Sequence, residues 1–177
     1  MLPTEEWLRV SLGRAILRAC ADDEVLLHRD ASERSMMFRV GRYLAPEVEE
    51  GWPGRLWVDL EYNRLAGTER IAKSVTGLLE PRSDNKVERA AARKRSVLPD
   101  LIVHDRTGRT RAHNILVVEA KKHPASQKAA HFDLEKLYAY KQQLDYQHAV
   151  YVELNKDRPR WQWIDIHNEM VIVPILA

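Results

Sequence analysis

The fold is decided by residues 96–122, SVLPDLIVHDRTGRTRAHNILVVEAKK. Two apolar runs rich in β-branched residues, Leu101–Val103 and Ile115–Val118, flank a polar segment that contains a glycine. Each run is too short for a helix, so the pattern predicts two strands joined by a turn. If the turn is centred in the middle of that polar segment, Asp100 lies directly across from Glu119.

Lys121 is expected to join these two acids, because side chains at positions i and i+2 of a strand share a face. The unbroken apolar runs indicate a sheet that is covered on both faces. Two carboxylates are costly to bury side by side, and a divalent cation would relieve their repulsion. Carboxylate oxygens with room for water suit Mg²⁺ or Mn²⁺, and Lys121 would lie beside a bound water or a scissile phosphate. Alternatively, this is a surface hairpin whose three charged residues form ordinary ion pairs.

The two segments Pro99–Asp100 and Glu119–Ala120–Lys121, which are eighteen residues apart, resemble the signature of the PD-(D/E)XK nuclease superfamily. The resemblance implies the restriction-endonuclease-like α/β fold, an αβββαβ core with a mixed central sheet flanked by helices, followed here by extra C-terminal strands. It also implies metal-dependent hydrolysis of nucleic acid. In that reaction Asp100, Glu119 and the carbonyl of Ala120 would hold the metal. Lys121 would orient or help deprotonate the attacking water and offset charge on the phosphate.

Glu33 is a further candidate for the metal site. A helix is predicted over residues 32–45, ending before Pro46. Its buried stripe is Met36, Met37, Val40 and Leu44. Glu33 lies at helical spacing from this stripe and is therefore expected to face inward, and an acid on this helix contributes to the metal site in the resembled superfamily. Alternatively, Glu33 is a first-turn acid stabilised by the helix dipole and by water.

The other expected elements surround this centre. A core helix is predicted to begin at Thr4, and strands at His148–Leu154, Trp161–Ile166 and Val171–Leu176. Residues 56–63 alternate between apolar and polar, which predicts a strand with one polar face. Its acids, Asp59 and Glu61, either point toward the proposed site or lie on an exposed face.

A helix is also predicted from Pro124 to about Tyr146. Four charged residues are expected on its solvent face, which are Asp133, Glu135, Lys136 and Lys141. Gln142 and Tyr146 match a Gln-x-x-x-Tyr pattern that some exonuclease-like members of the resembled superfamily place near the substrate. A tyrosine packed in the core explains the same spacing.

Basic residues flank the proposed site on both sides. The candidates for contact with nucleic acid are Arg93, Lys94, Arg95, Arg106 and Arg109. A phosphate backbone would have to pass here. A solvated face explains each cluster when it is taken alone.

The composition is typical of a soluble globular protein, with 45% hydrophobic and 31% charged residues. A length of 177 residues predicts a single nuclease-like domain over 1–177. Glu5 and Glu6 stand where a secretory signal would need a basic and apolar start, so a cytoplasmic location is expected. The one cysteine, Cys20, excludes an internal disulfide. The net charge of +2 does not by itself indicate a nucleic-acid binder.

These observations predict a Mg²⁺-dependent or Mn²⁺-dependent nuclease that acts on nucleic acid, with DNA as the first choice, as an endonuclease or an exonuclease. Cutting both strands of a duplex needs two sites, which favours a homodimer. A rival interpretation is a nucleic-acid-binding or assembly subunit that has the same fold and performs no chemistry. A third is a metal-dependent hydrolase of another phosphate ester.

Overall fold

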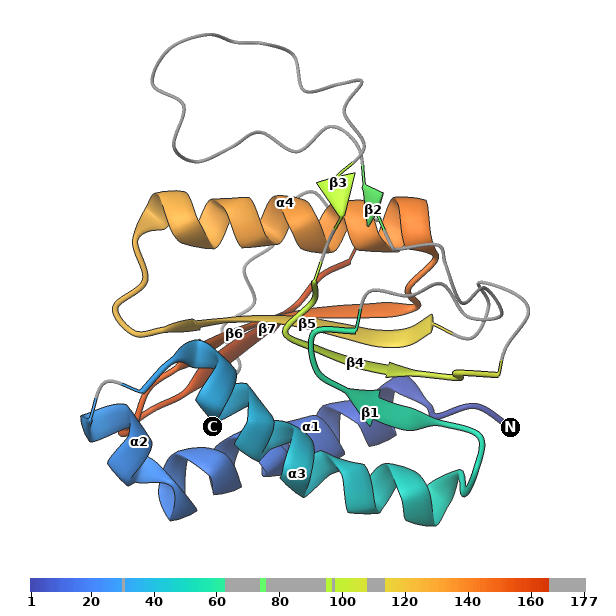
Figure 1. Ribbon diagram of the computed structural model, residues 1–177, viewed down its shortest axis with the longest axis horizontal. Helices are drawn as coiled ribbons and strands as arrows, with labels where there is room; N and C mark the ends of the chain where they lie inside the picture. The colour runs from blue at the N-terminus through green and yellow to red at the C-terminus, as the bar shows by residue number, and fades with distance from the viewer. Residues whose placement is uncertain (30, 63–73, 76–94, 97, 108–113, 166–177) are drawn as a thin grey trace, which may run out of the picture.

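A mixed five-stranded sheet lies between helices on its two faces (Figure 1). The computed structural model describes residues 1–29, 31–62, 74–75, 95–96, 98–107 and 114–165. The helices are α1 (Glu5–Asp22), α2 (Glu24–His28), α3 (Glu33–Gly51) and α4 (Gln127–Leu144). The strands of the sheet are β1 (Trp57–Asp59), β4 (Leu101–His104), β5 (Asn114–Lys122), β6 (His148–Leu154) and β7 (Arg160–Trp163). A separate two-stranded sheet pairs β2 (Ser74–Val75) with β3 (Arg95–Ser96).

The strand order of the main sheet is β1-β4-β5-β6-β7. Strands β5 and β6 are parallel, and helix α4 connects them, while the other neighbouring pairs are antiparallel. Along the chain, α3, β1, β4, β5, α4 and β6 give the expected order of helix, three strands, helix and strand. The predicted α/β class, with a mixed central sheet flanked by helices, is therefore confirmed.

The register of β4 and β5 is the one that the apolar runs predict. Leu101 lies opposite Val118, Ile102 opposite Val117, and Val103 opposite Leu116. The register shifts by one residue after Val103. The centre that was predicted for the turn lies within residues 108–113, outside the described part of the chain.

Each face of β5 contributes to a different core. Leu116, Val118 and Ala120 belong to the cluster that packs against α1 and α3, whereas Val117 belongs to the cluster that packs against α4. Because β-strand side chains alternate, Glu119 shares the face of Val117 and lies under α4. Both faces of the sheet are covered, so this is not a surface hairpin.

Helix α3 is longer than predicted, because it continues through Pro46 to Gly51. A proline inside a helix removes a hydrogen bond and costs about 3 kcal/mol. The extra turn buries Val48 in the core, and the amide of Trp52 closes the helix on the carbonyl of Val48 at 2.9 Å. Burial of Val48 beyond the proline thus offsets the free-energy cost of having Pro46 inside the helix. The side chains of Thr4 and Ser32 cap α1 and α3.

Three other elements have bounds that differ from those predicted. Helix α4 begins at Gln127 and not at Pro124, because the hydroxyl of Ser126 accepts a hydrogen bond from the amide of Ala129 at 3.2 Å and caps it. It ends at Leu144, because Asp145 adopts the left-handed conformation. Of the described residues in the strand predicted over 56–63, only those of β1 form a strand, and the one predicted at Trp161–Ile166 corresponds to β7; residues 63 and 166 lie outside the described part.

The other two C-terminal strands have different outcomes. Strand β6 has the predicted bounds. The strand predicted at Val171–Leu176 lies outside the described residues. Among the helices that the structure describes, none is long and apolar enough to span a membrane.

Cys20 lies buried in the core between the helices and the sheet. Burial raises the pKa of its thiol from 9.0 to about 11, against the effect of a backbone hydrogen bond from Asn155. Because the thiolate is the reactive form, we expect Ellman's reagent at about pH 8 to modify folded protein at least about a hundredfold more slowly than unfolded protein. Absorbance at increasing denaturant concentration measures this. Immediate stoichiometric labelling of the native protein would contradict the buried position.

Candidate functional site

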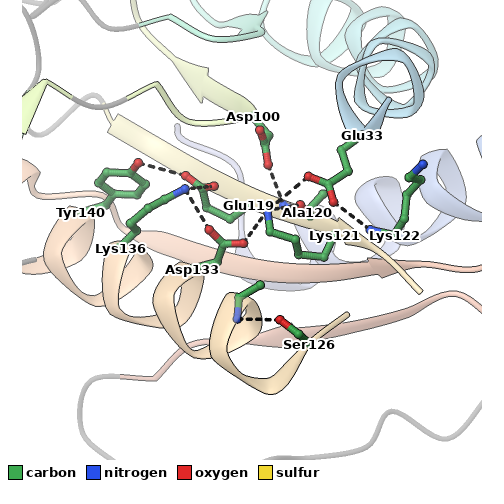
Figure 2. Close-up of polar contacts among 11 residues, drawn as sticks. Glu33, Asp100, Glu119, Ala120, Lys121, Lys122, Ser126, Asp133, Lys136 and Tyr140 are labelled. Carbon is green, nitrogen blue, oxygen red and sulfur yellow. Dashed lines mark hydrogen bonds and ion pairs between the residues drawn. The ribbon is translucent and has the colours of Figure 1, made fainter. Parts of the chain in front are cut away.

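Asp100 lies one position before the pair of Leu101 with Val118, and its carboxylate is directed at the Glu119–Ala120 segment of β5 (Figure 2). Asp100 immediately precedes β4, and its Oδ2 atom accepts a hydrogen bond from the backbone amide of Ala120 at 2.8 Å. Burial raises the pKa of Asp100, while this hydrogen bond opposes the shift. The structure therefore brings together the two acids that the hairpin register pairs.

Glu119 has donors at both of its carboxylate oxygens. The hydroxyl of Tyr140 donates to Oε1 at 2.9 Å, and the ammonium group of Lys136 contacts Oε2. The side chain is 1% exposed. Burial raises the pKa of Glu119 to about 8; Lys136 opposes this shift, and repulsion from Asp100 and Asp133 adds to it.

Lys121 lies on the same face of β5 and bridges two acids. Its Nζ atom is 2.8 Å from Oδ2 of Asp133 and 3.2 Å from Oε2 of Glu33, and it donates to the carbonyl of Ala120 at 3.1 Å. Burial disfavours its charged form, but the two carboxylates outweigh burial and raise the pKa of Lys121. The side chain is therefore a fixed cation at neutral pH.

Glu33 faces this group from the first turn of α3, as its spacing predicts. Besides the ion pair with Lys121, its Oε1 atom accepts a hydrogen bond from the backbone amide of Lys122 at 3.2 Å. Glu33 thus ties the start of α3 to the end of β5.

Helix α4 supplies three side chains that the sequence analysis did not assign to the site: Asp133, Lys136 and Tyr140 (Figure 2). The prediction that Asp133 lies on the solvent face was wrong, since it is 2% exposed and lies 2.9 Å from Nζ of Lys136. A signal was present, because Asp133, Leu137 and Tyr140 recur at the i, i+4, i+7 spacing of one helix face. The charge of Asp133 hid that signal, since charged residues are normally placed in solvent.

We call Glu33, Asp100, Glu119, Asp133, Lys121 and Lys136 the acid–lysine cluster. With every group ionised, it holds two more negative than positive charges. Its oxygen donors and its charge suit Mg²⁺. Among the described residues, however, no three acid, histidine or cysteine side chains are grouped as a ready set of metal ligands. The two ammonium groups lie between the acids instead.

Asp59 and Glu61 point to other partners. Asp59 lies 2.7 Å from Nε2 of His104 and forms an ion pair with Arg106, whose Nε atom donates to it at 2.8 Å. Glu61 pairs with Arg34. Neither acid contacts the acid–lysine cluster in the interactions of the described residues, so the suggestion that they point toward it is not supported.

The pair of Asp59 with His104 and Arg106 should stabilise the fold. Burial favours the neutral acid, but both partners outweigh it and lower the pKa of Asp59 below its ordinary 3.8. We expect Asp59→Asn to reduce the free energy of unfolding by about 2 kcal/mol at neutral pH. A carboxyl group whose pKa is lower in the folded than in the unfolded protein stabilises the fold at pH values above 3.8. This stabilisation is lost as the pH falls toward the pKa of the folded state.

Chemical denaturation of both proteins at a series of pH values measures this prediction. The control is Asp157→Asn, whose side chain is 78% exposed and which should change stability by less than about 0.5 kcal/mol. A difference between wild type and Asp59→Asn that does not shrink in acid would contradict the ion pair.

The predicted nucleic-acid contacts are only partly described. Arg93, Lys94 and Arg109 lie outside the described residues, and Arg95 lies in β3. Arg106 is engaged by Asp59 and lies over the ring of Trp57.

The Gln-x-x-x-Tyr pair is divided between surface and core. Gln142 is exposed, whereas Tyr146 is buried with its ring centroid 6.3 Å from that of Tyr140. The core position that was the alternative for Tyr146 is the one that the structure shows.

Comparison with protein-family models, with curated proteins and with solved structures gave no match.

Proposed function

We propose that this protein is a Mg²⁺-dependent nuclease with a restriction-endonuclease-like fold that hydrolyses phosphodiester bonds, with DNA as its substrate. One observation carries the proposal: Asp100 and Glu119 meet across β4 and β5, with Lys121 on the same face as Glu119. The order of helices and strands supports it, because it matches the core that the resemblance implies.

Asp100 and Glu119 would hold the metal ion, with help from the carbonyl of Ala120 and from Glu33. When bound, Mg²⁺ would neutralise charge on the phosphate and favour deprotonation of the attacking water. Mn²⁺ has the same preference for oxygen ligands and would substitute for it.

Lys121 would act as a cation and not as a base. Its ion pairs with Asp133 and Glu33 favour the protonated form. An ammonium group in this position can offset the negative charge that develops on the phosphate during attack by water. Of the two roles that the resemblance implies for Lys121, charge compensation has the stronger physical basis.

A second candidate function is a nucleic-acid-binding or assembly subunit without activity. The observation in its favour is that both oxygens of Glu119 are already engaged by Tyr140 and Lys136. If those contacts persist when metal is present, the ligand set cannot form.

A cleavage assay separates the two functions. The protein is incubated with plasmid, linear duplex, single-stranded DNA, RNA and mononucleotides, in Mg²⁺, in Mn²⁺ and in chelator. We expect cleavage of DNA in either metal and none in chelator. Cleavage of mononucleotides alone would indicate a different phosphate-ester hydrolase. No cleavage of any substrate, together with no Mn²⁺ binding that Glu119→Gln can remove, would reject the nuclease.

A further inference from the structure

We infer that Lys136 is a built-in counterion of the metal site, which neutralises Glu119 in the metal-free protein and moves away when the metal binds. This inference rests on the proposed function, because it concerns the same site. It assigns Lys136 a role in controlling metal entry that neither the sequence pattern nor the resemblance suggests.

The contacts of Lys136 support this role. Its ammonium group contacts Oε2 of Glu119 and lies 2.9 Å from Oδ1 of Asp133. The side chain is 17% exposed, so these carboxylates replace much of its water. The ammonium group therefore occupies a cation position between two buried acids.

Tyr140 determines which oxygen of Glu119 the metal would use. Its hydroxyl holds Oε1 at 2.9 Å, so Oε2 is the oxygen that is released when Lys136 leaves. A hydrogen bond from Tyr140 can orient the carboxylate whether or not a metal is bound, as groups behind metal ligands commonly do. Glu119 would therefore offer a metal ion the same oxygen, Oε2, that Lys136 contacts here.

Lys121 is less suited to this exchange. Its ion pairs are with Glu33 and Asp133, and the described interactions place no contact between it and Glu119. In the position where it contacts the two acids, Nζ of Lys136 also lies over the ring of Phe132, one turn earlier on α4, at 5.8 Å from the ring centroid. An aromatic face attracts an ammonium group and helps to hold it close to the carboxylates.

Lysine acetylation of the wild-type protein tests the inference. The protein is treated with an acetylating reagent in Mg²⁺ and in chelator, and mass spectrometry measures the extent of acetylation at each lysine. Calorimetry of the same protein preparation, before acetylation, measures Mg²⁺ binding. Loss of the ion pair to Glu119 should make the acetylation of Lys136 about tenfold faster in Mg²⁺ than in chelator. Lys156, whose side chain is on the surface, is the internal reference and should not change.

Two variants complete the experiment. In Glu119→Gln the ion pair with Glu119 is lost while the one with Asp133 remains, so Lys136 should react faster than in the wild type and should not respond to Mg²⁺. Glu135→Gln changes an acid on the same helix that pairs with His131, and it should respond as wild type does. If both variants are folded, these results would support the exchange of Lys136 for a metal ion at Glu119 specifically.

The outcomes distinguish the inference from the proposed function. If calorimetry shows that Mg²⁺ binds but Lys136 remains protected, the counterion role is overturned and the nuclease proposal stands. If Mg²⁺ does not bind to the wild type, the metal site is overturned and the inference with it. A Lys136 response that persists in Glu119→Gln would also overturn the inference, because the exchange would not involve that carboxylate.

Discussion

Replacing Asp100 with asparagine should abolish cleavage of DNA, with a fall in rate of at least about a hundredfold. Asparagine is nearly isosteric and can still accept the hydrogen bond from the amide of Ala120, which Asp100 accepts at 2.8 Å. It cannot supply the negative charge that a metal ion requires. Initial rates on linear duplex in Mg²⁺ measure the effect, and circular dichroism confirms that the variant is folded.

Lys121→Ala is expected to cause a loss of similar size for a different reason. It removes the cation beside the phosphate and leaves the two proposed ligands Asp100 and Glu119 in place. Mg²⁺ binding should therefore survive in Lys121→Ala and be lost in Asp100→Asn. Unchanged cleavage by either variant would refute the assignment of these residues, and Asp157→Asn serves as the surface control with wild-type activity.

Replacing Asp133 with alanine should have the largest effect on stability. Its carboxylate is 2% exposed and lies within 2.9 Å of two ammonium groups, those of Lys121 and Lys136. Its removal deprives each lysine of one of its two acid partners, and we expect the free energy of unfolding to fall by about 3 kcal/mol. Urea denaturation followed by circular dichroism measures this change.

The matched control for this variant is Glu135→Ala, two residues later on the same helix. Glu135 is one-third exposed and pairs with His131 one turn earlier, so its loss should cost less than about 0.5 kcal/mol. Equal stability of the two variants would show that the ion pairs of Asp133 contribute nothing to the fold.

The pairing of β4 with β5 could be predicted from the local sequence pattern. Two apolar runs of known spacing can pair in few ways that keep both faces of the sheet covered, and the centre of the polar segment selects one of them. The predicted pairing of residues 101–103 with 116–118 was therefore confirmed, and the proximity of Asp100 to Glu119 follows from it. The inward direction of Glu33 was likewise predictable, because helical spacing relates it to a buried stripe.

Patterns of charge were less informative than patterns of apolar residues. Asp133 and Lys136 are charged and were expected on the solvent face of their helix, yet α4 turns both toward the sheet, where Asp133 pairs with Lys121 and Lys136 pairs with Glu119. Asp59 is the opposite example. It lies on the face of its strand that was expected to be polar, and it pairs with His104 and Arg106 and not with the residues of the proposed metal site. Which charges pair depends on distances between segments that are far apart along the chain.

The amino-acid sequence by itself determined the register of β4 against β5, and with it the closeness of Asp100 to Glu119, because apolar periodicity and strand alternation are local properties of the chain. The mixed sheet was expected from the resemblance. Only the tertiary structure decided that helix α4 brings Asp133, Lys136 and Tyr140 onto those acids. The physical reason is that the position of a crossover helix over a sheet is determined by packing between elements, and the partners of a buried charge follow from that packing.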